Sequence, residues 1–256
     1  MNIYFDHVLG KQQKEDFMHT LVSATFSESE WDYAFQNGWA PTNLWFESDF
    51  ARSYPIIWYQ SRQTRIVLED YAPSRKTKKL ANNPDIDIIV SNSLLCPEDE
   101  VYEIYVKYCK HKNFGDMLDK EDVVKYFSDI FSSLLIHFYH KGKLVAITKI
   151  SIWATSAFAE FFWWDYEQPD LSLGKLSFYY EAEEIKKLGF KFLYMGLGYN
   201  SDSIYKSCKK GFQFWNGRYW SDDSSLFSTL CEKDDSVSCL DSLIDYQEEY
   251  LRIANI

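Results

Sequence analysis

The chain has 256 residues, 46% of them hydrophobic and 18% aromatic, so it can bury a sizeable core and is too apolar to be disordered. Its formal net charge of −11 argues against a non-specific nucleic-acid coat, which would need a basic surface. The 5 cysteines include no pair two to four residues apart, which predicts no metal site, and the lack of a signal peptide and of an apolar run near ~18 residues predicts a cytoplasmic protein that does not enter a membrane.

The first predicted elements are a short helix and a strand in an aromatic N-terminal region. Ser27 and Glu30 have the spacing of a capping box, in front of a helix that stops at Gly38. Residues 64–68 contain β-branched side chains and predict a strand. We expect residues 1–70 to form a smaller N-terminal region of the protein.

A short basic helix is predicted over residues 73–80. Ser74 or the proline before it opens the helix, and Pro84 halts it. The cationic side chains on this helix are candidates for contacts with nucleic-acid phosphates, and they include Arg75, Lys78 and Lys79. Runs of charge are often only solvated faces, so both interpretations stay open at this point.

Strands and helices alternate through the middle of the chain. Hydrophobic residues recur with the period of a strand or of an amphipathic helix. The predicted strands are residues 85–90, 134–140, 143–153 and 158–165, and the predicted helices are residues 97–112 and 120–131. The strand at 158–165 is apolar on both faces, so we expect it in the centre of a sheet.

Residues 157–220 carry the most informative arrangement, which is strand, helix, strand, short helix, strand. The first helix is capped by Ser172 and opens on Ser172-Leu173-Gly174, and the next strand ends in Gly196-Leu197-Gly198-Tyr199. Backbone N–H groups at such places can stabilise an oxyanion, although both glycine sites can also be plain turns. A last strand is predicted over residues 212–220, followed by an acidic, serine-rich stretch and a helix at 240–253.

In this order, the segments resemble the arginyl-tRNA–protein transferases and their bacterial leucyl-transferring relatives. The motifs that carry the resemblance, over residues 60–210, are Tyr71-Ala72-Pro73-Ser74-Arg75-Lys76, Trp164-Asp165-Tyr166, Leu193-Tyr194-Met195-Gly196 and Tyr205-Lys206. The resemblance implies an α/β fold of the N-acetyltransferase-like (GNAT) type, a mixed sheet flanked by helices, over residues 71–225, with an acidic C-terminal segment at 226–256. Members of the family carry cysteines before the Pro-Ser-Arg element, whereas residues 52–59 here have none.

The resemblance also implies an enzyme. It would be an aminoacyltransferase that moves an amino acid of the arginine or leucine type from aminoacyl-tRNA to an amine of a protein, a peptide or a small molecule, with the aminoacyl-tRNA as co-substrate and no further cofactor. Two alternatives stay open. One is an acyl-CoA-dependent N-acyltransferase, although Asp170-Leu171-Ser172-Leu173-Gly174 fits the pyrophosphate loop of those enzymes poorly. The other is a catalytically inactive relative that binds tRNA or peptide.

The predicted catalytic residues are Asp165, Tyr194 and Tyr205. Asp165 ends an apolar strand, and burial would make its carboxyl a better proton acceptor, although it can equally cap the following turn. The two tyrosines can hydrogen-bond the amine or the leaving oxygen, or simply pack. The residues predicted to bind substrate or tRNA are Ser74, Arg75, Lys78, Lys79, Ser172, Leu173, Gly174, Gly196, Tyr199 and Lys206.

Overall fold

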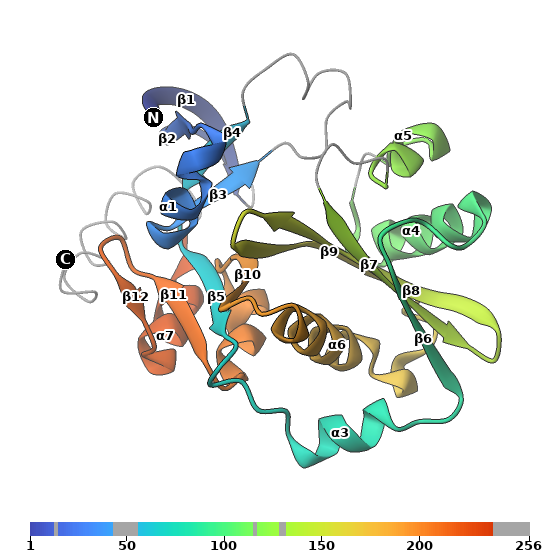
Figure 1. Cartoon of the computed structure of the whole chain (residues 1–256). Helices are drawn as coiled ribbons and strands as arrows, with labels where there is room; N and C mark the ends of the chain where they lie inside the picture. The colour runs from blue at the N-terminus through green and yellow to red at the C-terminus, as the bar shows by residue number, and fades with distance from the viewer. Residues whose placement is uncertain (13–14, 43–55, 115–116, 128–131, 238–256) are drawn as a thin grey trace. The chain divides into compact units, whose positions relative to one another are not determined.

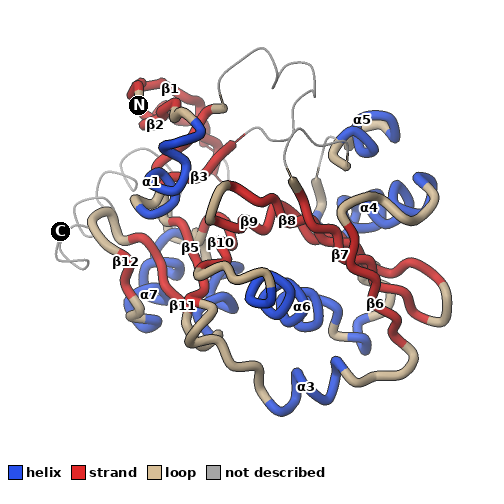
Figure 2. The backbone as a smooth tube through the Cα atoms, viewed as in Figure 1, coloured by secondary structure: helices blue, strands red, loops and turns tan. Residues whose placement is uncertain are grey.

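The computed structural model describes residues 1–12, 15–42, 56–114, 117–127 and 132–237 (Figure 1). The chain divides into two compact units. Unit 1 consists of Met1–Leu44, Pro55–Tyr71 and Tyr194–Ile256, and unit 2 consists of Trp45–Tyr54 and Ala72–Leu193. Helices and strands occur in both units, as Figure 2 shows, so the prediction of an α/β fold with helices flanking a mixed sheet is confirmed. The three-part division predicted from the sequence stays a prediction.

Unit 1 contains an antiparallel four-stranded sheet in the order β1-β2-β4-β3. The strands are β1 (Asn2–Gln12), β2 (Glu15–Thr25), β3 (Trp39–Thr42) and β4 (Ile57–Gln60). The turn η1 (Glu28–Glu30) and helix α1 (Trp31–Gln36) connect β2 to β3. The predicted capping box is confirmed, because the Ser27 N–H donates to the Glu30 carboxylate at 3.0 Å. The β1–β2 hairpin was not expected from the sequence.

A second group of strands in unit 1 surrounds β5 (Gln63–Val67), which lies between β11 (Phe212–Trp215) and β10 (Phe192–Leu197). β10 begins in unit 2 and ends in unit 1. The prediction of one strand over 212–220 is wrong: β11 turns back into β12 (Trp220–Ser221), with which it pairs antiparallel. The Asn216 side chain makes this turn by accepting from the N–H groups of Arg218 and Tyr219, both at 3.0 Å.

Two helical segments complete unit 1. The predicted short helix is a 3-10 helix, η3 (Ser201–Cys208). The acidic stretch after residue 220 forms helix α7 (Ser224–Asp234), which begins where the Asp223 carboxylate accepts from the Leu226 N–H at 2.9 Å. From the sequence, this stretch was described only by its composition and no helix was predicted over these residues, although aspartate is a favoured residue at a helix start. The helix predicted at 240–253 lies outside the described residues.

Unit 2 is built on the antiparallel strands β6 to β9, each paired with the next. Their bounds are β6 (Ile86–Ser91), β7 (Ser133–His140), β8 (Lys143–Trp153) and β9 (Ser156–Trp164). The helical segments are α3 (Arg75–Ala81), α4 (Glu98–Lys112), α5 (Lys120–Lys125), η2 (Pro169–Leu171) and α6 (Leu173–Lys187). Each of these elements overlaps one predicted from the sequence, apart from the short η2 turn.

Helices cover both faces of the unit 2 strands (Figure 1). Ile147 of β8 packs in a cluster with α4 and α5, whereas the next residue, Thr148, contacts Glu181 of α6. Successive residues of a strand point to opposite faces, so α4 and α6 lie on opposite sides of β8. The strand is buried along most of its length for this reason.

Glu181 is a buried carboxyl group on the α6 side. Thr148 Oγ1 lies 2.8 Å from both the Phe161 carbonyl oxygen and Glu181 Oε1, and the Ser177 hydroxyl also donates to this carboxyl group. Thr148 has one hydroxyl hydrogen, which it directs toward both oxygens. Burial raises the pKa of Glu181.

Candidate functional site

The residues predicted to act together are divided between the two units. Unit 2 carries the basic helix, Asp165 and the start of α6, and unit 1 carries the end of β10 and the segment η3.

Helix α3 presents a basic patch, defined as Arg75, Lys76, Lys78 and Lys79, whose side chains are all exposed. Ser74 begins the helix, because its hydroxyl oxygen accepts from the Thr77 N–H at 3.1 Å. Ser74 thus supports the helix that carries the charges. Exposed cations on one short helix have the chemistry needed to contact phosphates.

Asp165 follows β9 directly and is buried, with 2% of its surface exposed. Its Oδ1 accepts from the Glu167 N–H at 2.9 Å, so it does cap the following turn. Its Oδ2 accepts from Lys107 Nζ of α4 at 3.0 Å, and Lys107 also donates to Glu167 at 2.8 Å. These carboxylates, Glu167 first, raise the pKa of Lys107. The Asp165 carboxylate is therefore placed to accept from an alkylammonium group, and a substrate amine would have to replace Lys107 there.

The start of α6 is built differently from the prediction. Ser172 adopts a left-handed conformation, with φ 51 and ψ 40, and its side chain makes no capping bond, so the predicted serine cap is wrong. Leu173 is fully buried and packs in the core, which leaves only its backbone for a ligand. A Cβ added at Gly174 would meet no atom of the described residues within 4 Å. The first turn of α6 therefore has open space beside its backbone.

The three tyrosines of the prediction occupy different settings in unit 1. Tyr194 is fully buried; its ring packs 4.7 Å from that of Phe35 and its hydroxyl accepts from Arg65 at 3.5 Å. Tyr205 lies on η3 and is 62% exposed. The Tyr199 hydroxyl accepts from the Arg62 N–H at 3.0 Å, and burial raises the pKa of this hydroxyl. Tyr194 therefore packs as core in this structure, and the catalytic roles stay predictions.

Residues 195–201, which we term the β10-exit loop, are held by side chains along four consecutive carbonyls. Lys206 Nζ donates to the Met195 oxygen at 2.9 Å and to the Leu197 oxygen at 2.6 Å. The Gly196 oxygen accepts from Thr64 Oγ1 at 2.7 Å. The Gly198 oxygen accepts from Arg62 Nη1 at 3.2 Å. The loop is thus fixed from both η3 and β5 before any ligand arrives.

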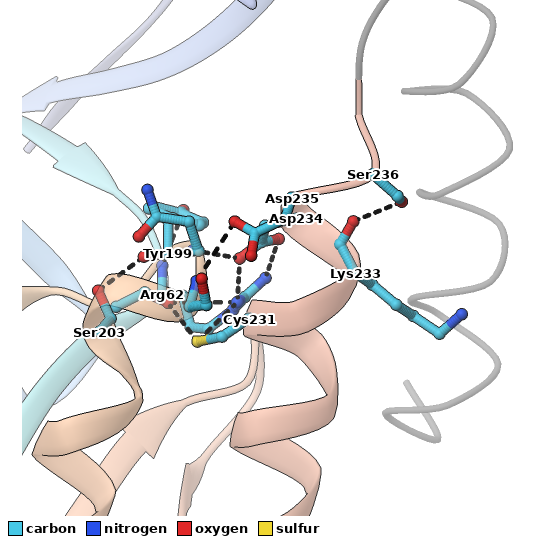
Figure 3. A network of polar contacts seen from close by, with 11 residues as sticks. Arg62, Tyr199, Ser203, Cys231, Lys233, Asp234, Asp235 and Ser236 are labelled. Atoms are coloured by element: carbon cyan, nitrogen blue, oxygen red, sulfur yellow. Dashed lines mark hydrogen bonds and ion pairs between the residues drawn. The ribbon is translucent and has the colours of Figure 1, made fainter.

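Arg62 links the β10-exit loop to the end of α7 (Figure 3). Its guanidinium makes a two-pronged ion pair with Asp234, at 2.8 and 3.1 Å, and both side chains are largely buried. The Asp234 carboxylate also accepts from the Asn200 N–H at 2.9 Å. Asn200 has φ 55 and ψ 170, a conformation that side chains disfavour, so these bonds hold strain in the loop.

The two glycines of the β10-exit loop are required for different reasons. A Cβ at Gly198 would lie 2.7 Å from both Phe227 and Thr64, so only glycine fits there. Gly196 has a φ of +72, which favours glycine, but a Cβ there would meet no described atom within 4 Å. Packing thus requires glycine at position 198, and backbone conformation favours glycine at position 196.

Three residues of these sites were missed by the sequence analysis: Lys107, Arg62 and Asp234. Lys107 and Asp165 are 58 residues apart, and Arg62 and Asp234 are 172 apart. No local spacing signals pairs of this kind. Within the described parts of the chain, no group of three or more His, Cys, Asp or Glu side chains could hold a metal ion. No helix there is long and apolar enough to cross a membrane.

Comparison with known proteins finds a family match that covers part of each group and excludes the basic helix α3. Residues 100–213 match the family described as "Arginine-tRNA-protein transferase, C terminus". The chain is similar to aspartate/glutamate leucyltransferases: 24% identical over 164 residues to that of Polynucleobacter asymbioticus, covering 60% of this chain and 65% of the relative. It is 25% identical over 163 residues to that of Shewanella putrefaciens, covering 61% and 68%. The matched segment thus spans about two thirds of the relatives' own length. The resemblance predicted from the sequence motifs is confirmed.

Several solved structures have partial likeness to this chain. The C-terminal domain of a putative lysylphosphatidylglycerol synthetase from Agrobacterium fabrum has a TM-score of 0.45 at 12% identity, covering 72% of this chain and 56% of that one. FemX has a TM-score of 0.44 at 10% identity, covering 87% of each chain. The PaiA N-acetyltransferase of Thermoplasma acidophilum has a TM-score of 0.33 at 16% identity, covering 41% and 75%.

Proposed function

We propose that this chain, a relative of the arginyl-tRNA–protein transferases, is an aminoacyl-tRNA-dependent aminoacyltransferase. The observation that carries the proposal is the family match over residues 100–213, because that segment contains Asp165, the first turn of α6, the β10-exit loop and the pair Tyr205-Lys206. The amino acid transferred would be of the arginine or leucine type. The acceptor would be an amine of a protein, a peptide or a small molecule.

The main requirement of this reaction is that the protein position the acceptor amine next to the ester carbonyl. The acceptor nitrogen attacks the ester carbonyl carbon of the aminoacyl-tRNA, a C–N bond forms, the bond to the tRNA 3′ or 2′ oxygen breaks, and the proton lost by the nitrogen ends on that oxygen. Because the ester is already activated, correct positioning supplies much of the catalysis, up to about 7–11 kcal/mol in ideal cases. A loop whose carbonyls and strained backbone are fixed in advance, as residues 195–201 are, suits such a role.

The donor would be recognised mainly through its phosphates. The basic patch of α3 is exposed and follows the Tyr71-Ala72-Pro73 motif, and its affinity for an acceptor stem should fall as salt rises. Asp165 would orient the incoming amine after Lys107 is displaced, in keeping with the ammonium that it binds now. Aminoacyl-tRNA is made and used in the cytoplasm, which is the compartment that we propose for this protein.

The test uses the purified chain, a tRNA pool charged with radiolabelled amino acids, and a cell extract as the source of acceptors. We expect label to move to an acceptor in a reaction that RNase treatment of the charged tRNA abolishes. Transfer from acetyl-CoA to simple amines, measured in parallel, would instead identify an acyl-CoA-dependent enzyme. Label that moves equally well after the tRNA has been destroyed would refute the proposal.

A further inference from the structure

Lys206 makes contacts that differ from those predicted for it. The sequence motifs predicted that it binds tRNA phosphates, yet its ammonium donates to the Met195 and Leu197 carbonyls. Lys206 lies on η3 and is half-buried. Two of the three ammonium hydrogens are therefore engaged by the protein's own backbone. A phosphate could displace these bonds only by releasing the end of β10.

The two carbonyls that Lys206 contacts lie on either side of Gly196, whose φ of +72 departs from extended backbone. The carbonyl of Gly196 itself accepts from Thr64 of β5. Lys206 therefore bridges the backbone across the residue at which the strand departs from extended geometry.

We propose that Lys206 is a positioning residue for acyl transfer, whose ammonium clamps the Met195 and Leu197 carbonyls and so fixes the β10-exit loop in its reactive geometry. This inference rests on the proposed function. It differs from a phosphate contact, because the partner of the ammonium is the protein backbone. It also differs from a purely structural bond, because the strength of the clamp changes with protonation.

The surroundings of Lys206 set the pH range of that change. Burial lowers the pKa of Lys206 to about 8, and the nearby Cys231 thiol of α7 opposes this shift. β10 contributes the Met195 and Leu197 carbonyls to the ammonium, and the charges of Arg62 and Asp234, near Cys231, are paired with each other. Charged donors make stronger hydrogen bonds than neutral ones. The clamp is therefore strong below about pH 8 and weakens above it.

The experiment compares Lys206→Arg and Lys206→Met with the wild type, using Lys191→Met as the matched control. Lys191 is an exposed lysine just before β10 with no role in the clamp. Hydrogen exchange of the loop amides reports on the clamp without reference to activity; the informative N–H groups are those of Gly198, Asn200 and Ser201, which are bonded to Arg62, Asp234 and Asp235. Transfer from aminoacyl-tRNA is measured on the same proteins.

We expect Lys206→Met to speed exchange of these amides about tenfold and to lower kcat with little change in KM for the tRNA, whereas Lys191→Met changes neither. Wild-type protection, corrected for intrinsic exchange, should fall as the pH rises from about 7 to about 9. Lys206→Arg should keep its protection over that range, because a guanidinium stays protonated.

Three outcomes would overturn the inference: Lys206→Met with wild-type exchange, Lys206→Arg with the same loss of protection at high pH, or Lys206→Met with unchanged kcat and a raised KM for tRNA. Unchanged kcat with a raised KM would instead indicate that Lys206 binds a tRNA phosphate. A failure of Lys206→Met to fold leaves the comparison of the wild type with Lys206→Arg decisive. A wild type that transfers nothing while its exchange follows the expected pattern would instead refute the proposed function.

Discussion

Three glycines of the candidate site should respond differently to alanine, and the structure gives a magnitude for each. At Gly198 a Cβ would lie 2.7 Å from Phe227 and Thr64, so Gly198→Ala overpacks the site and should cost about 1–3 kcal/mol in the free energy of unfolding. At Gly196 there is room for a Cβ, but its φ of +72 should make Gly196→Ala cost about 1–2 kcal/mol. Gly174 lies within α6 with open space, so Gly174→Ala should gain up to about 1 kcal/mol.

The assay is urea unfolding of the three variants under the same buffer conditions, together with transfer from aminoacyl-tRNA. The order of stability should be Gly174→Ala, wild type, then the two loop variants. A Gly198→Ala variant as stable as Gly174→Ala would refute the packing of Phe227 and Thr64 around the β10-exit loop. If the first turn of α6 faces a substrate, Gly174→Ala should lose transfer activity although its free energy of unfolding rises.

The remaining predictions concern charge. Arg75→Glu together with Lys78→Glu should weaken tRNA binding and reduce the steepness of log K against log salt by about one for each phosphate that the protein no longer neutralises. A filter-binding titration measures this slope. An unchanged slope would show that the basic patch does not contact tRNA. Arg62→Met should cost about 3–5 kcal/mol in the free energy of unfolding, measured in urea, because it leaves a buried carboxylate without its cation. Adding Asp234→Asn should recover part of that loss. A double variant whose loss equals the sum of the losses of the two single variants would contradict this prediction. Burial raises the pKa of Glu181, so its stability contribution is present below the unfolded pKa of about 4.3 and is lost as pH rises toward the folded value. Glu181→Gln should therefore gain stability relative to the wild type with increasing pH, and a difference that stays constant from acid to neutral pH would show that Glu181 is ionised in the folded protein.

Elements with strong periodicity could be predicted from the sequence, because burial on one face imposes that periodicity. The β7–β8 hairpin at Gly142 and the amphipathic helix α4 are examples. The β11–β12 hairpin was missed although Asn216-Gly217 is a usual hairpin signal, since aromatic residues on both sides suggested one continuous strand. Helix α7 was not predicted, because the stretch was described only as acidic and serine-rich; the Asp223 side chain begins the helix by accepting from the Leu226 N–H.

The candidate site could be predicted in its parts but not in its contacts. The motifs pointed to the end of β9 and the exit from β10, because glycines and a lone acidic residue stand out at strand ends. The ion pairs of Asp165 with Lys107 and of Arg62 with Asp234 depend on tertiary folding. Lys206 was predicted to bind substrate or tRNA, but its carbonyl partners follow from the path of η3, which no sequence pattern revealed.

The dependence of the β10-exit loop on α7 has a consequence for how the protein matures. Arg62 is synthesised well before Asp234. The N–H groups of Asn200 and Ser201 gain their hydrogen-bond acceptors only when Asp234 and Asp235 have been synthesised. A ribosome-bound chain that has not yet released these aspartates from the exit tunnel cannot complete the strained loop. Competence for transfer would thus require that the chain be made at least to residue 235, and cleavage by a protease ahead of residue 234 would remove the bonds of Asp234 and Asp235 to the β10-exit loop.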